Sequence, residues 1–136
     1  MKTGEGIDTP RAVKIEVKRV YEPPDPGDGL RVLVDRLWPR GLSRARAQVD
    51  VWAREYAPSD ELRRWFGHRE ERFGEFRERY LAELDAHREE LEALARSAER
   101  PGLTLLYAAR DQERNNAVVL AEAIRSMAGP DTSPAR

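Results

Sequence analysis

The feature that most constrains the fold is the segment Leu30–Gly41, whose sequence is LRVLVDRLWPRG. It begins as a short apolar run and ends in charged side chains, an indole, a proline and a glycine. Apolar runs of this kind, bounded by turn residues, are typical of buried strands in a parallel sheet. In open α/β sheets, ligands bind at the carboxyl ends of such strands. The segment therefore predicts a central strand over Leu30–Leu37 and a polar site where that strand ends.

Two other segments have the pattern of strands. Val13–Tyr21 alternates apolar and charged residues, a period of two that predicts a strand with one face covered, as at the edge of a sheet. Leu103–Ala109 is almost wholly apolar and predicts a second buried strand. Val49–Tyr56 fits either a helix or a strand, and we expect a short strand or an extended segment because Pro58 follows closely.

Helical periodicity dominates the second half of the chain. Apolar residues three and four apart predict one long helix over Glu70–Glu99 and a final amphipathic helix over Arg114–Met127. Ser43 and Ser59 are good N-caps for two short helices, and Gly67 is expected to end the second of them. The order of strand, long helix, strand and helix is that of an α/β fold. We expect a single domain over residues 13–127, with flexible tails at 1–12 and 129–136.

Composition excludes several classes of function. The chain has no cysteine, which rules out disulfides, thiolate nucleophiles and cysteine-based zinc sites. His68 and His87 are far apart, and phosphate-loop and dinucleotide fingerprints are missing, so we predict neither a metal nor a cofactor. Lys and Arg number 24 against 25 Asp and Glu, a net charge of −1 that disfavours general attraction to nucleic acid or anionic membranes. No apolar run approaches about 18 residues, and we expect a cytoplasmic protein without a membrane span.

Candidate site residues follow the two buried strands. After the first come Asp35, Arg36, Trp38 and Arg40, and around the end of the second come Tyr107, Arg110, Asp111, Asn115 and Asn116. If the two strands are parallel neighbours, these groups converge on one crevice, to which the following helix adds the positive end of its dipole.

Each of these groups has a chemical role and a structural alternative. Asp35 is the candidate catalytic acid or base, and Arg36, Arg40 and Arg110 are donors suited to a phosphate or carboxylate. Alternatively, Asp35 pairs with an arginine to satisfy a buried strand end, and Asp111 only caps the last helix. The two aspartates could also cancel the arginines by pairing with them, which would leave a neutral pocket.

Arginines are also concentrated just beyond the first strand. An anion-binding or nucleic-acid-contacting lip would be formed by Arg31, Arg36, Arg40, Arg44 and Arg46. The alternative is a solvated, salt-bridged surface, especially for the last two. Trp38 could stack on a base or sugar, although packing in the core is the more frequent role of a single tryptophan.

Several segments together resemble a known family: Arg31–Gly41, Trp52, Ala57–Ser59, Glu61–Arg63, Trp65–Phe66, Thr104–Asp111 and Asn115–Leu120. They are similar to the short, YeaO-like branch of the domain-of-unknown-function 488 family, whose biochemical role is not established. The resemblance implies a compact three-layer α/β domain with a small, mainly parallel sheet flanked by helices. It also implies that Asp35, Arg36, Arg40, Tyr107, Asp111 and Asn115 or Asn116 line a common pocket.

Longer members of that family carry a turn with Cys and His near the last helix. The corresponding turn here, Arg110–Asn116, has no thiol, so thiol chemistry does not transfer to this chain.

Three functions remain open from the sequence. The first is a small α/β protein that binds an anionic ligand, or an enzyme acting on a phosphorylated or carboxylated metabolite. The second is a nucleic-acid-associated module that uses the arginine lip, and the net charge disfavours it. The third is a structural or regulatory partner protein without catalysis. The sequence leaves the oligomeric state undetermined.

Overall fold

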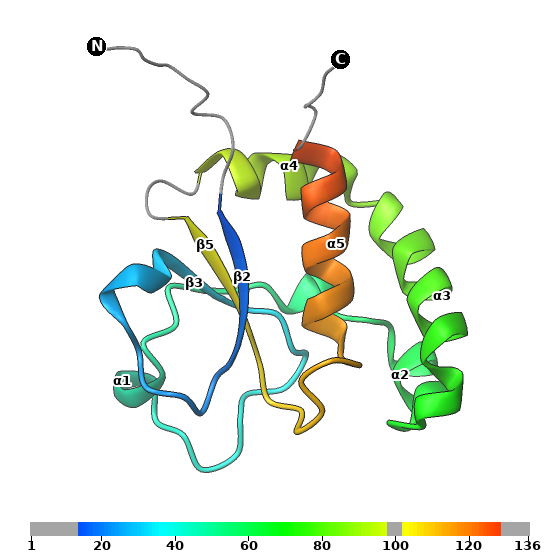
Figure 1. The fold of residues 1–136 in the computed structure, drawn as a ribbon, viewed down its shortest axis with the longest axis horizontal. Coiled ribbons are helices and arrows are strands. Elements are labelled where there is room, and N and C mark those ends of the chain that lie inside the picture. Colours follow the sequence, from blue (N-terminus) through cyan, green and yellow to red (C-terminus); the bar gives the residue numbers. More distant parts are fainter. Residues whose placement is uncertain (1–13, 98–101, 129–136) are drawn as a thin grey trace.

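A small parallel sheet forms the centre of the molecule. The computed structural model describes residues 14–97 and 102–128. Its four strands are β2 (Ile15–Arg19), β3 (Leu30–Leu33), β4 (Val51–Trp52) and β5 (Leu103–Tyr107). They are arranged in the order β2-β5-β3-β4, and every neighbouring pair is parallel (Figure 1). The predicted edge strand and the two predicted buried strands are therefore confirmed, with β3 and β5 side by side in the middle.

Five α-helices connect and cover the strands. They are α1 (Arg44–Ala47), α2 (Asp60–Phe66), α3 (Phe73–Asp85), α4 (Arg88–Ser97) and α5 (Asn116–Ala128). Short 3-10 turns lie at Pro26–Asp28, Arg54–Tyr56 and Glu70–Arg72. Ser43 and Ser59 cap α1 and α2 as expected, each accepting a hydrogen bond from a backbone N–H in the first turn. Gly67 ends α2 in the left-handed conformation that glycine adopts readily.

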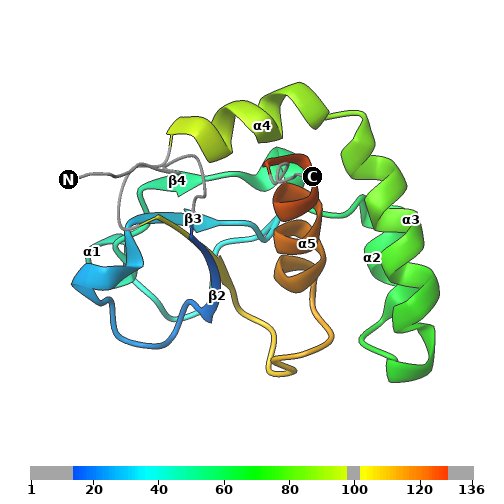
Figure 2. The ribbon, with the colours of Figure 1, turned by 45° about the horizontal axis from the view of Figure 1, so that its top comes forward.

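Apolar side chains fill both faces of the sheet. The larger cluster lies between the sheet and the helices α2–α5, and includes Leu105, Leu120 and Leu84. The smaller cluster lies on the opposite face under α1 and its loops, and includes Leu33 and Leu106. Figure 2 shows α5 standing between the sheet and α3 on one side, with α1 on the other. This is the expected compact α/β arrangement in three layers, although the layer beside α1 consists mainly of loops.

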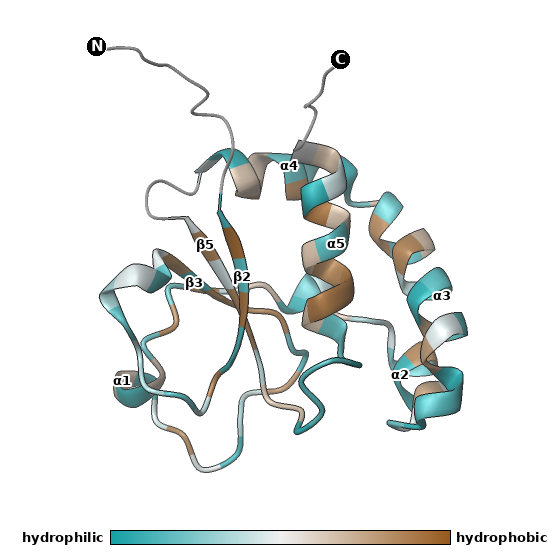
Figure 3. Ribbon diagram, in the orientation of Figure 1, coloured by the Kyte–Doolittle hydropathy of each residue, from teal (hydrophilic) through white to brown (hydrophobic). Residues whose placement is uncertain are grey.

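The site-bearing end of the sheet is the end where the strands stop. Figure 1 shows α4 across the opposite end, while α5 begins beside the carboxyl ends of the strands and runs back along the sheet. The turn that leads into α5 is hydrophilic, whereas the strands and the first turns of α5 are largely hydrophobic (Figure 3). No helix within residues 14–97 and 102–128 has the length and apolar character needed to cross a bilayer.

The prediction of one long helix over Glu70–Glu99 is wrong. The chain forms a 3-10 turn, then α3, then turns at Ala86 and His87 before α4. At that corner Ala86 N–H and His87 N–H donate to Glu83 and Leu84, three residues back, in the tighter pattern of a 3-10 turn. The corner lets α4 pack against α5 on its way to β5. Residues 98–99, which the prediction also covered, lie outside the described residues, as do the predicted tails 1–12 and 129–136.

The first buried strand is shorter than predicted, because β3 ends at Leu33 rather than at Leu37. Val34 still donates its N–H to Leu106 O at 3.0 Å, and in a continuing parallel ladder Ala108 N–H would donate to Val34 O. Instead Ala108 N–H donates to the carboxylate of Asp35, and Val34 O accepts from the Asn116 amide. Side chains thus take over the backbone pairing at the point where the strand ends.

Candidate functional site

A pocket of about 390 Å³ opens at the carboxyl ends of β3 and β5. We call it the strand-end pocket. It is lined by six of the nine residues proposed from the sequence, which are Asp35, Arg36, Trp38, Arg40, Asn115 and Asn116. They come from the loop after β3 and from the start of α5, which the parallel pairing of β3 with β5 brings together.

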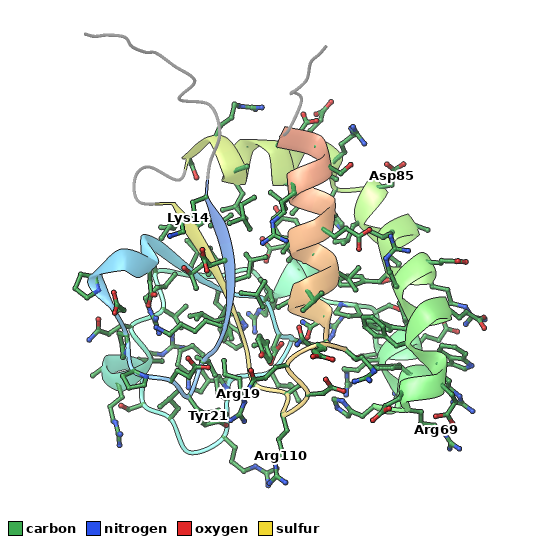
Figure 4. The ribbon with its side chains drawn as sticks, viewed as in Figure 1. Lys14, Arg19, Tyr21, Arg69, Asp85 and Arg110 are labelled. Atoms are coloured by element: carbon green, nitrogen blue, oxygen red, sulfur yellow. The ribbon has the colours of Figure 1, made fainter. Side chains whose placement is uncertain are left out.

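Two of the other three proposed residues lie in an adjoining hollow. Arg110 and Asp111 line it together with Arg19, and it shares Tyr21, His68, Ala108 and Ala109 with the strand-end pocket. Figure 4 shows Arg19, Tyr21 and Arg110 at the same end of the molecule, below the strands. Asp35 and Asp111 therefore lie at one edge of the sheet, as expected, but in neighbouring hollows. Tyr107 lies in the larger apolar cluster, 3% exposed, and is not among the lining residues of either hollow.

Asp35 holds three separate segments together. Its Oδ2 accepts from Ala108 N–H at 2.9 Å, and its Oδ1 accepts from the Asn116 Nδ2 amide at 3.0 Å. Its backbone carbonyl accepts from the Trp52 indole at 2.9 Å. None of the ion pairs in the described residues includes Asp35, so its charge is met by neutral donors rather than by an arginine. Asp35 satisfies the buried strand end, although not by the arginine pair that the structural alternative foresaw.

Burial raises the pKa of Asp35 above the ordinary value of 3.8. The hydrogen bonds from Asn116 and Ala108 and the nearby His68 act in the opposite direction, but they do not outweigh the loss of hydration. A carboxyl group in this setting keeps its proton to a higher pH than an exposed aspartate does.

The raised pKa makes a prediction about stability and pH. Folding favours the protonated form of Asp35, so its contribution to stability is full below about pH 4 and is lost as pH rises through the folded pKa. The free energy of unfolding of the wild type, relative to that of Asp35→Asn, should therefore fall as pH is raised from about 3.5 to 7. Denaturant titrations of both proteins at several pH values measure this difference. A difference that increases with pH would contradict the assignment.

The cations of the pocket differ in how they are paired. Arg36 and Arg63 both lie 3.1 Å from the same carboxylate oxygen of Asp60, and the Arg36 contact is an ion pair without the alignment of a hydrogen bond. Arg40 is exposed, and no ion pair or side-chain hydrogen bond to it occurs within the described parts of the chain. Its backbone carbonyl accepts from the Tyr21 hydroxyl at 2.8 Å, which ties its loop to the chain beyond β2. The guanidinium of Arg40 is thus the least committed cation of the pocket.

The arginine lip proposed from the sequence does not include Arg31 in the structure. Arg31 is 4% exposed and donates to Asp28 and to the carbonyls of Ala47 and Gln48, so it is a structural residue. Arg44 lies 4.8 Å above the ring of Trp38, outside the pocket lining. The proposed lip included Arg31, and the burial of that residue removes its first member.

Trp38 packs against the core and also lines the strand-end pocket. Its indole N–H donates to Leu42 O at 2.6 Å, and its ring packs edge-on against Trp52 with centroids 5.4 Å apart. These contacts fix it beside the smaller apolar cluster, while it also lines the strand-end pocket.

Sequence reasoning missed part of the pocket wall. Phe66 and Phe76, which belong to the larger apolar cluster, also line the pocket, as do Arg63 and the Ala57–Pro58 pair. His68, which was not among the candidate site residues, lines both hollows and has a positive φ of 58°, a conformation that is strained for histidine. The position of His68 directly after Gly67, which ends α2, was the one feature of the sequence that could have indicated this role.

No group of three or more His, Asp or Glu side chains is placed to hold a metal ion within residues 14–97 and 102–128. The pocket's own ionisable residues are mainly cationic, and a single carboxylate, Asp35, lines it. Its chemistry therefore favours an anion over a metal ion.

Comparison with known proteins identifies the family of the chain. A family model described as "Inactive DUF488-N3 subclade" matches residues 14–133. The chain belongs to the DUF488 family. The uncharacterized protein YeaO of Escherichia coli K12 is 46% identical over 115 residues, which cover 85% of this chain and 100% of YeaO. The uncharacterized protein Rv3073c of Mycobacterium tuberculosis H37Rv is 44% identical over 112 residues, covering 82% of this chain and 94% of that protein. No solved structure gives a significant match.

These relatives confirm the resemblance to the YeaO-like branch of DUF488. In this DUF488 chain the turn before α5 is organised by Asp111, which accepts from Glu113 N–H at 2.9 Å and Arg114 N–H at 3.0 Å and pairs with the Arg114 guanidinium. These hydrogen bonds lower the pKa of Asp111. The side chain of Asn115, not Asp111, caps α5 by accepting from Val118 N–H at 2.9 Å.

Proposed function

We propose that this DUF488 protein binds a small anion, a phosphate or a carboxylate, at the mouth of the strand-end pocket and does not transform it chemically. The observation that supports the proposal most is the pairing of charges. Both oxygens of Asp35 accept from neutral donors, while the guanidinium of Arg40 has no ionic partner in the described residues. The arginine is therefore not neutralised by the one carboxylate of the pocket.

The charge balance of the lining also supports an anion. Three guanidinium groups, those of Arg36, Arg40 and Arg63, line the pocket against the single carboxylate of Asp35. Asp60 offsets part of the charge of Arg36 and Arg63, since it pairs with both. The remaining positive charge lies next to the start of α5, where the helix dipole favours an anion as well.

Binding without catalysis agrees with the description of the matching family model as inactive. It also agrees with the contacts of Asp35, the acid or base proposed from the sequence, because both of its oxygens serve in holding the strand end together. Each oxygen of Asp35 accepts one hydrogen bond from the protein, which gives this residue a structural role at the strand end.

Calorimetric titration of inorganic phosphate and of acetate at low salt tests this proposal. We expect binding to the wild type that weakens roughly ten- to a hundredfold in Arg40→Ala, since a charge-assisted hydrogen bond contributes about 1.5–3 kcal/mol. Arg46→Ala is the matched control, because Arg46 is exposed on α1 and does not line the pocket. Equal affinity in all three proteins, or no detectable binding by any of them, would contradict anion binding and favour a structural or regulatory partner protein.

A further inference from the structure

The wall of the strand-end pocket changes character with depth. Its buried lining residues are mainly apolar, namely Pro39, Ala57, Pro58, Phe66 and Phe76. Its exposed lining residues include three cationic or titratable side chains, those of Arg40, Arg63 and His68. A ligand that satisfies both zones needs an apolar end and a charged end, with the charge outermost.

Flat side chains dominate the inner zone. Phe66 and Phe76 are 6% and 2% exposed, and their rings stack at a centroid distance of 4.4 Å. Proline rings and the indole of Trp38 form further flat surfaces in the lining. Because the two phenyl rings stack on each other, a ligand ring would meet their edges, together with the proline rings and the indole, and edge-to-face contacts of this kind are favourable.

The volume of the pocket and the exposure of Leu37 also favour a ligand with an apolar part. A pocket of about 390 Å³ is large enough for a small organic molecule, and one inorganic anion would leave most of it unfilled. Leu37, also in the lining, is 67% exposed and stands between Arg36 and Trp38 in the same loop. Its exposed side chain adds apolar surface at the rim of the pocket, which a bound ring would cover.

We propose that the ligand is an amphipathic anion, a ring-containing molecule with one phosphate or carboxylate. Its ring enters toward Phe66 and Phe76 and packs against the exposed Leu37 at the rim, and its anionic group stays at the mouth beside Arg40 and Arg63. The inference rests on the anion binding proposed above and adds the apolar body that the anion carries.

Titration of phenyl phosphate beside inorganic phosphate tests it. Burial of the phenyl ring predicts that the wild type binds phenyl phosphate on the order of tenfold more tightly than inorganic phosphate. Leu37→Ser should narrow that ratio, because it removes apolar surface at the mouth from a side chain too exposed to matter for folding. Arg46→Ala should leave both affinities unchanged.

The outcomes separate the two proposals. Equal affinity for the two phosphates, or a ratio that Leu37→Ser leaves unchanged, overturns the amphipathic ligand and leaves anion binding standing. Binding of neither anion overturns both proposals. Tighter binding of phenyl phosphate that is lost in Arg40→Ala supports both.

Discussion

Replacing Leu84 with alanine is expected to lower the free energy of unfolding by about 2–5 kcal/mol. Leu84 is 1% exposed in the larger apolar cluster, on the face of α3 that packs toward α5. The substitution removes the contacts of the leucine side chain and leaves a cavity that the surrounding helices cannot fully close. Chemical denaturation of the wild type and of Leu84→Ala measures the effect.

Leu37→Ala is the matched control for that measurement. Leu37 is 67% exposed, so the same change of side chain should alter the free energy of unfolding by no more than about 0.5 kcal/mol. A Leu84→Ala protein that unfolds at the denaturant concentration of the wild type would show that α3 is not packed against the rest of the fold.

Replacing Arg31 with methionine is expected to cost about 2–4 kcal/mol, because it leaves two carbonyl oxygens without their donors and takes from Asp28 one of its two cationic partners. The side chain of Arg31 is 5% exposed and lies 2.5 Å from Asp28, which also pairs with Lys18 at 3.0 Å. Its other nitrogens donate to Ala47 O and Gln48 O, which would lose these donors. The substitution therefore removes the side-chain hydrogen bonds that join β3 to the end of α1.

The protonation of Asp28 offers a second measurement of the same prediction. Burial alone would raise the pKa of Asp28, but hydrogen bonds from Lys18, Asp25 N–H and Arg31 lower it below its ordinary value. In Arg31→Met, NMR titration should find that the pKa of the Asp28 carboxyl has risen. Arg31→Lys, which keeps the charge but not the planar donors, should be intermediate in stability. Arg46→Met, at an exposed position, should stay close to the wild type, and equal stability of all variants would contradict the buried network.

The position of the site could be predicted from the sequence, because it depends on local patterns. Apolar runs at Leu30–Leu37 and Leu103–Ala109 end in polar residues, and parallel pairing of neighbouring strands brings such ends together. The partner of Asp35 could not be predicted in this way. Ala108 and Asn116 are 73 and 81 residues further along the chain, and only the register of β3 with β5 places them beside the carboxylate.

The two main errors have related physical causes. The corner at Ala86 and His87 contains no proline or glycine, and the apolar spacing from Tyr80 through Leu84 to Leu91 continues across it, so local periodicity predicts an unbroken helix. The corner arises from the packing of α4 on α5, a tertiary effect. Periodicity likewise places Phe76 on an inward face, but it does not distinguish the core from the wall of a pocket.

Binding of an anion at the mouth of the strand-end pocket can be tested residue by residue. Titration of inorganic phosphate, followed by amide NMR, assigns the contact to individual residues. Saturable shifts are expected at the amides of Arg40, Ala108, Ala109 and Asn116, and they should be lost in Arg40→Ala. Shifts that are absent, or that gather on α1 and persist in Arg40→Ala, would contradict anion binding there.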